Sequence, residues 1–196
     1  MALDWFPGHK PKPGHEAEFR EIVATLFWDK LGRADRAAAS RARRPRAIFS
    51  RTPAVRRTTE ELRQRYDQIG IPASDDLGAP RIGDAAPDGC AEPLSFRAQD
   101  LAGTTEIIGD HLLSACYEVK FAPDLSAFGR ALLIRVSAFA KAKKLDVPEM
   151  RPADPASAEG QLHVVQAAGR WCQFWGERGH FLEPSFEWSA RLMPPI

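Results

Sequence analysis

The sequence predicts an all-α protein, built as an irregular bundle of about five helices in a single domain over residues 1–196. Apolar side chains recur at helical spacing in several separate segments, and no convincing alternating strand pattern is present. The composition, 44% hydrophobic and 27% charged, is that of an ordinary globular chain, and the length suits one domain or at most two. A chain of this size buries roughly 70% of its unfolded surface, so it needs no disulfide or metal to fold.

The first expected helix covers residues 16–31. Acidic residues favour its beginning, and Gly32 is expected to end it. Its apolar positions form one face, made of Phe19, Ile22, Val23, Leu26 and Phe27. A second helix is expected to begin after Thr58 and to reach about Gln68, because Thr58 and Glu61 have the spacing of a capping box.

Two further helices are expected in the second half of the chain. Residues 96–120 keep helical spacing, with an interruption or kink expected at residues 103–105. Asp124 is expected to cap the next helix, which reaches about Leu145. The stripe that predicts this helix is Leu125, Phe128, Leu132, Val136 and Phe139.

The last main helix is expected to begin at Asp154 and Pro155, which match an N-cap followed by proline at the first helical position. It runs to about Arg178, and Gly179 is expected to stop it. Its apolar face consists of Leu162, Val165, Ala168, Cys172 and Trp175.

Residues 33–57 form an arginine- and alanine-rich segment with nine arginines and one acid, Asp35. The segment therefore carries +8, and the rest of the chain −7. Ordering about 25 backbones costs on the order of 25 kcal/mol, and burying its three large apolar side chains returns only ~6 kcal/mol. We expect a mobile segment with transient helix, which either contacts nucleic acid or an acidic partner or is simply a soluble linker.

Residues 70–94 are expected to form a long acidic loop. The stretch holds four glycines and four prolines, and five acids face a single base, Arg81. Loops of this length are usually functional or disordered.

The N-terminal leader contains the triplet Pro-Gly-His twice, which places His9 and His15 six residues apart. Paired metal ligands normally sit at other spacings, so we interpret the triplets as two turns that lead into a helix. The stretch Trp5 to His9 resembles the N-terminal segment of the circularly permuted ribosome-assembly GTPases. Those enzymes bind phosphate through a loop containing Gly-Lys, and because this chain has no Gly-Lys dipeptide, we exclude the family.

No other catalytic signature stands out. Glu177 and His180 have the Glu-x-x-His spacing of dimetal bundles, but only one such motif is present and Gly179 lies inside it. The chain lacks a Gly-x-Ser-x-Gly elbow, and Cys116 and Cys172 lie on or beside apolar helix faces. We therefore expect no metal and no cofactor.

The densest aromatic segment, residues 169–188, holds six of the 18 aromatic residues. One interpretation is a core helix with an aromatic tail. The other is a site for a protein partner or small ligand, because tryptophan and arginine are frequent at binding hot spots. The residues proposed for such a site are Trp5, Arg170, Trp171, Trp175, Arg178 and His180.

Two alternative functions are kept. One is a small enzyme in which His15, Glu177 and His180 meet where the leader joins the C-terminal helix. The other is a nucleic-acid binder that uses the arginine-rich segment as an arm. The three cysteines are odd in number and distant, and no secretory signal or membrane-spanning stretch is visible, so we expect a cytoplasmic protein.

Overall fold

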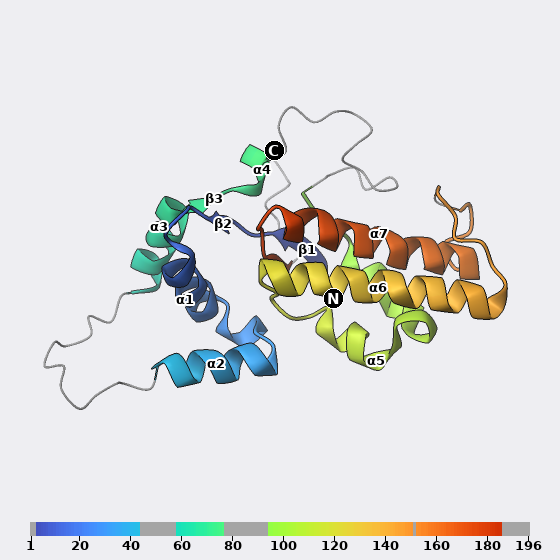
Figure 1. The fold of residues 1–196 in the computed structure, drawn as a ribbon, viewed down its shortest axis with the longest axis horizontal. Helices are drawn as coiled ribbons and strands as arrows, with labels where there is room; N and C mark the ends of the chain where they lie inside the picture. The colour runs from blue at the N-terminus through green and yellow to red at the C-terminus, as the bar shows by residue number, and fades with distance from the viewer. Residues whose placement is uncertain (1–2, 44–57, 77–93, 151, 186–196) are drawn as a thin grey trace, which may run out of the picture.

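The structure, a computed structural model, describes residues 3–43, 58–76, 94–150 and 152–185. Over these residues the chain forms seven α-helices, two short 3-10 helices and four short strands (Figure 1). The mainly helical class is confirmed. The purely all-α prediction is wrong in one respect, because the strands form two small antiparallel pairs.

The N-terminal helices are α1 (Glu16–Leu26), the 3-10 helix η1 (Trp28–Lys30) and α2 (Arg33–Arg43). The helix expected over residues 16–31 thus ends earlier, and a separate 3-10 turn follows it. Residues 33–43 of the arginine-rich segment are helical, and Arg20 of α1 donates to Asp35 of α2 at 3.1 Å. The rest of the segment predicted to be mobile, residues 44–57, lies outside the described residues.

Helix α3 (Thr59–Ile69) begins with the predicted capping box: the Glu61 amide donates to the Thr58 hydroxyl, and the Thr58 amide donates to the Glu61 carboxylate. Two short elements follow, β3 (Gly70–Ile71) and α4 (Ala73–Asp76). The beginning of the predicted 70–94 loop is therefore structured, and residues 77–93 lie outside the described part of the chain.

The segment after residue 94 contains η2 (Ala98–Thr104) and α5 (Thr105–Ala115). The helix expected over residues 96–120 is thus interrupted within the predicted 103–105 region, and α5 ends at Ala115. Gly109 has φ 75°, a left-handed conformation that glycine adopts without strain, and it kinks α5.

Helices α6 (Ala122–Lys143) and α7 (Ala158–Glu177) form an antiparallel pair (Figure 1). Their predicted caps were misplaced. Asp124 lies inside the first turn of α6, where Pro123 takes an early helical position. Ser157, and not Asp154, caps α7 by accepting from the Gly160 amide at 3.0 Å, because Asp154 instead accepts from the Ala156 amide within the preceding turn. Helix α7 ends before Gly179, as predicted.

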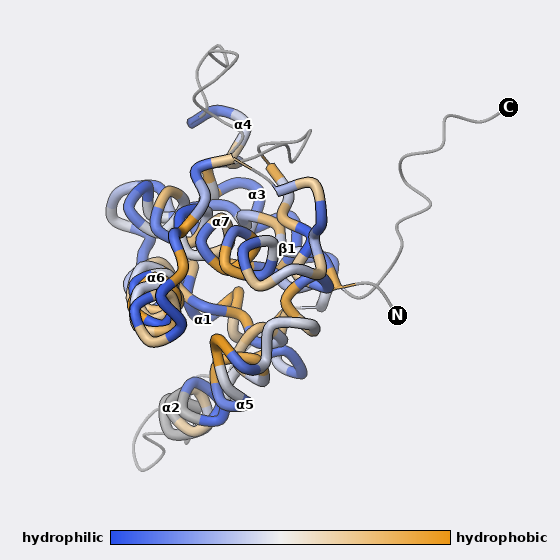
Figure 2. Tube along the Cα trace, turned by 90° about the vertical axis from the view of Figure 1, so that its right-hand side faces the viewer, coloured by the Kyte–Doolittle hydropathy of each residue, from blue (hydrophilic) through white to orange (hydrophobic). Residues whose placement is uncertain are grey.

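Three glycines bring α6 and α7 into close contact. A Cβ on Gly129 would lie 2.7 Å from the Gly169 carbonyl oxygen, and one on Gly176 would lie 2.3 Å from the Ser126 hydroxyl. The two backbones thus approach to a distance that no side chain at these positions would allow. In Figure 2 these helices carry alternating hydrophilic and hydrophobic bands, as expected of helices with one buried face.

The strands join regions distant in sequence. β1 (Asp4–Pro7) pairs with β4 (Leu182–Ser185), and β2 (Lys10–Pro11) pairs with β3. Each strand has two to four residues, and three of the four contain proline. Such segments are too short to show an alternating pattern in the sequence. They are recognised as strands only because they pair with another segment in the fold. The pairing of β1 with β4 brings the N-terminal leader against the segment that follows α7.

Two groups of buried apolar side chains form the interior. The larger lies among η2, α5, α6 and α7 and includes Trp5. The smaller lies between α1 and α3 and includes Phe181 from the segment after α7. Leu182, the next residue, belongs to the larger group, which places the segment after α7 at their junction.

Candidate functional site

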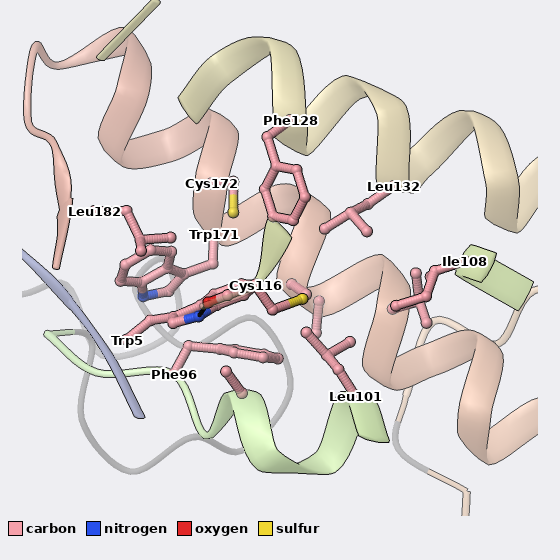
Figure 3. Close-up of a cluster of buried hydrophobic side chains, with 14 of the residues drawn as sticks. Trp5, Phe96, Leu101, Ile108, Cys116, Phe128, Leu132, Trp171, Cys172 and Leu182 are labelled. Carbon is pink, nitrogen blue, oxygen red and sulfur yellow. Dashed lines mark hydrogen bonds between the residues drawn. The ribbon is translucent and has the colours of Figure 1, made fainter. Parts of the chain in front are cut away.

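Trp5 lies at the centre of the larger core (Figure 3). Its side chain is fully buried, and its indole Nε1 donates to the Cys116 carbonyl at 2.9 Å. Its ring centroid lies 5.3 Å from that of Phe96 and 6.0 Å from that of Trp171. The predicted site requires contact between the leader and α7, and Trp5 makes that contact. The contact lies inside the core and not at the surface.

Trp171 and Trp175 are also interior residues, with exposed fractions of 3% and 0%. Trp175 packs edge-on against Phe174 at 5.0 Å and against His180 at 5.1 Å between ring centroids. The three tryptophans predicted to contact a ligand are thus buried in the interior of the protein. Their burial agrees with the interpretation of the aromatic segment as a core helix.

His180 occupies a buried junction between the two ends of the chain. Its Nδ1 donates to the Gly8 carbonyl at 2.8 Å, and its Nε2 lies 2.8 Å from Oδ2 of Asp76. The ammonium of Lys10 donates to the same Asp76 oxygen. We call His180, Asp76, Lys10 and the Gly8 carbonyl the junction cluster. It ties together the leader, α4 and the segment after α7.

The Asp76 carboxyl is held ionised by its neighbours. Burial alone would raise its pKa, but the hydrogen bonds from Lys10 and His180 outweigh burial and lower the pKa below its ordinary value. The Gly8 carbonyl and the Asp76 carboxylate each lie within hydrogen-bond distance of one ring nitrogen of His180, so both nitrogens have partners within the fold. His180 consequently has no free nitrogen with which to accept a proton from a substrate.

The three predicted catalytic residues differ in their surroundings. His15 precedes α1 and lies 3.5 Å from the Glu18 carboxylate, whereas Glu177 is exposed at the end of α7. Within the described ranges, no hydrogen bond or ion pair joins any two of His15, Glu177 and His180.

The first Pro-Gly-His triplet has a packing role. The His9 ring stacks on Tyr66 with centroids 4.5 Å apart, and the His9 amide donates to the Tyr66 hydroxyl at 2.8 Å. Burial lowers the pKa of His9, although Asp67 acts in the opposite direction. In the second triplet Gly14 has φ 85°, and His15 precedes the first turn of α1. The second triplet forms a turn, as predicted, whereas in the first triplet Pro7 ends β1 and Gly8 and His9 form no turn.

The described cysteines are buried free thiols, as their places beside apolar helix faces suggested. Burial raises the pKa of Cys116 to about 12 and that of Cys172 well above its ordinary value. Both thiols are therefore protonated near neutral pH, which removes their nucleophilic form.

One exposed feature of the predicted site remains at the surface of α7. Arg170, Phe174 and Arg178 follow one another at four-residue intervals, and both arginines are exposed. The Arg178 guanidinium lies 3.5 Å from the Phe174 ring centroid, and its Nη1 donates to the Phe174 carbonyl at 3.0 Å. We call these three residues the α7 row. Neither arginine forms an ion pair with any described carboxylate.

Two parts of this arrangement were missed at the level of sequence. Phe174 is absent from the residues proposed for the site, although its four-residue spacing from both arginines indicates the α7 row. Lys10 and Asp76 gave no signal, because they meet His180 only through long-range folding.

The described residues contain no group of three or more His, Cys, Asp or Glu side chains that could hold a metal ion. None of the described helices is both long enough and apolar enough to cross a membrane. Comparison with protein-family models, with curated proteins and with solved structures finds no match for this chain.

Proposed function

We propose that this protein is a cytoplasmic binding module that recognises an acidic segment of a partner protein through the α7 row. The observation that carries the proposal is the pair of exposed arginines on either side of Phe174, neither of which forms an ion pair with a described carboxylate. Arginine presents a planar fork of donors that matches a carboxylate.

The row is held ready for binding. Phe174 is half-buried and rests on the buried Trp175. Arg178 is restrained both by the Phe174 ring and by its hydrogen bond to the Phe174 carbonyl. Side chains that are already ordered lose less entropy when a partner binds. The buried tryptophans thus have an indirect role, which is to fix the position of Phe174.

The shape of the row favours a peptide segment over a small molecule. Eight residues of α-helix span about 12 Å, and the row runs along α7 with an exposed arginine at each end. Small ligands generally require concave sites that enclose most of their surface. An extended or helical segment could instead lie along the row, with carboxylates at Arg170 and Arg178 and an apolar side chain against Phe174.

The test is a fluorescence-polarisation titration with short labelled peptides that carry two carboxylates on either side of an apolar residue. Peptides with amides in place of the carboxylates are the ligand control. We expect binding of the acidic peptides and a loss of about tenfold or more in R170Q/R178Q, which corresponds to ~1.4 kcal/mol.

The matched control is R63Q/R97Q, which removes the same charge from two exposed arginines outside α7. This control should retain wild-type affinity. Equal binding of acidic and amide peptides, or equal losses in the two double variants, would contradict the proposal.

A further inference from the structure

Helix α6 carries an unusual distribution of charge. Residues 125–145 include no acidic residue and five basic ones: Arg130, Arg135, Lys141, Lys143 and Lys144. All five are exposed, and none forms an ion pair with a described residue. By contrast, Lys10, Arg20 and Arg65 each pair with a described carboxylate. The acid within α6 is Asp124, in its first turn, so the rest of the helix is purely basic.

These cations sit on a free surface of a rigid element. The opposite side of α6 is buried, through Leu125, Leu132 and Val136, so α6 has one side in the core and one in solvent. The solvent side contains a stripe of Ala127, Arg130, Ile134, Ala138 and Lys141. From Arg130 to Lys144 the helix rises about 21 Å.

A second basic helix lies on the same side of the molecule. In Figure 2, α6 and α2 both lie toward the left of the view, and Figure 1 shows them as separate, nearly horizontal helices. Arg33 and Arg36 of α2 are exposed. Helices α2 and α6 thus lie on the same side of the molecule, and each has exposed basic residues.

We propose that the solvent side of α6 is a second binding surface, separate from the α7 row, and that its partner is duplex DNA. A duplex carries one negative charge per ~1.7 Å, so a length equal to the basic part of α6 presents about 12 charges. An α-helix of about 10–12 Å diameter fits the ~12 Å major groove. The small side chains Ala127 and Ala138 leave room for close approach, while Arg130 and Lys141 reach phosphates.

The composition of the stripe favours a duplex over other polyanionic partners. A helix that binds a membrane surface inserts an apolar face into the lipid. The apolar face of α6 is buried in the core, and the stripe on its solvent side contains one large apolar residue, Ile134. Single-stranded nucleic acid is usually held by stacking on aromatic rings, and the stripe has none.

The experiment measures binding of the full chain to a labelled DNA duplex of arbitrary sequence by fluorescence anisotropy, between about 50 and 200 mM salt. The variants are R130Q/K141Q and the charge-matched control R63Q/R97Q, each checked for an unchanged unfolding temperature. We expect wild-type affinity to fall steeply with salt. In R130Q/K141Q the slope of log K against log salt should decrease by about 1.8, because two phosphate contacts are lost. The control should keep the wild-type slope.

Three results would overturn the inference. One is no duplex binding by the wild type at the lowest salt. A second is the same slope in R130Q/K141Q and R63Q/R97Q, which would indicate an effect of net charge alone. The third is binding of phosphatidylcholine–phosphatidylserine vesicles without binding of the duplex, which would make the surface a lipid contact.

Discussion

At the scale of single residues, the junction cluster shows how one carboxylate can hold three chain segments. Asp76 accepts from Lys10 of the leader and from His180 after α7. Its own position at the end of α4 brings in a third segment. Because His180 is fully buried, its N–H groups cannot find water if Asp76 is lost.

Replacing Asp76 with Asn should therefore lower the free energy of unfolding at neutral pH by about 1–3 kcal/mol, because a charged acceptor of two donors is removed. Denaturant unfolding measures the change. D75N is the matched control, since Asp75 is the exposed neighbour in the same short helix and should change stability by less than about 0.5 kcal/mol. A D76N protein as stable as D75N would show that the junction cluster does not stabilise the fold.

The pH dependence of stability follows from the same cluster. The pKa of Asp76 is lowered in the fold, so its contribution is fully present above the ordinary value of 3.8 and is lost as pH falls through the folded value. The acid limb of the stability curve should be shallower in D76N than in the wild type. Parallel acid limbs would contradict the lowered pKa.

A second loss of stability, caused by His9, is expected at milder acidity. Its pKa in the fold lies below 6.5, mainly because of burial, so the unfolded chain takes up a proton first as pH falls. Stability should therefore decrease as pH drops below about 6.5. Unfolding midpoints across this range should change less in H9Q, and an identical pH dependence in H9Q and the wild type would exclude His9 as the cause.

At the scale of elements, helices with long apolar stripes were predictable and their ends less so. The stripes of α6 and α7 follow from sequence because each buries a continuous face. The cap at Thr58 was correct since both partners of the capping box lie within four residues. The predicted caps at Asp124 and Asp154 were wrong because aspartate also favours the first turn of a helix and the turns between elements.

The glycine contact between α6 and α7 gives an element-scale prediction. Gly129→Ala should destabilise the protein by about 1–3 kcal/mol, since the added methyl meets the backbone of α7, even though alanine favours helix by ~1 kcal/mol. Thermal unfolding measures the change. Gly103→Ala, where nothing lies within 4 Å of the new methyl, is the control and should not destabilise. Stabilisation by both substitutions would mean that α6 and α7 are not closely packed.

At the scale of the whole molecule, the arrangement depends on contacts that no local pattern contains. The β1–β4 pair and the bond from His180 to Gly8 join residues near opposite ends of the chain. The sequence identifies the two segments that meet, the leader and the aromatic end of α7, and leaves core and surface open as alternatives for the tryptophans of α7. Aromatic density alone does not distinguish core from surface, because tryptophan is common in both.

Trp5 tests this global arrangement. Its replacement by alanine should cost about 3–5 kcal/mol, because the residue fills the core between Phe96, Phe128 and Trp171. Ile134→Ala is the control, since Ile134 is 67% exposed, and should change stability little. Chemical denaturation compares the two variants. A mild effect of Trp5→Ala would mean that the leader does not pack against α7.

The central claim is that the buried tryptophans support an exposed α7 row that contacts the partner. Amide chemical-shift mapping of the labelled full chain with the acidic peptide tests it most directly. The account predicts that perturbations centre on residues 170–178 and are weak in α1 and α3, with R170Q/R178Q abolishing them. Perturbations centred on another element, or the same map in R170Q/R178Q, would contradict it.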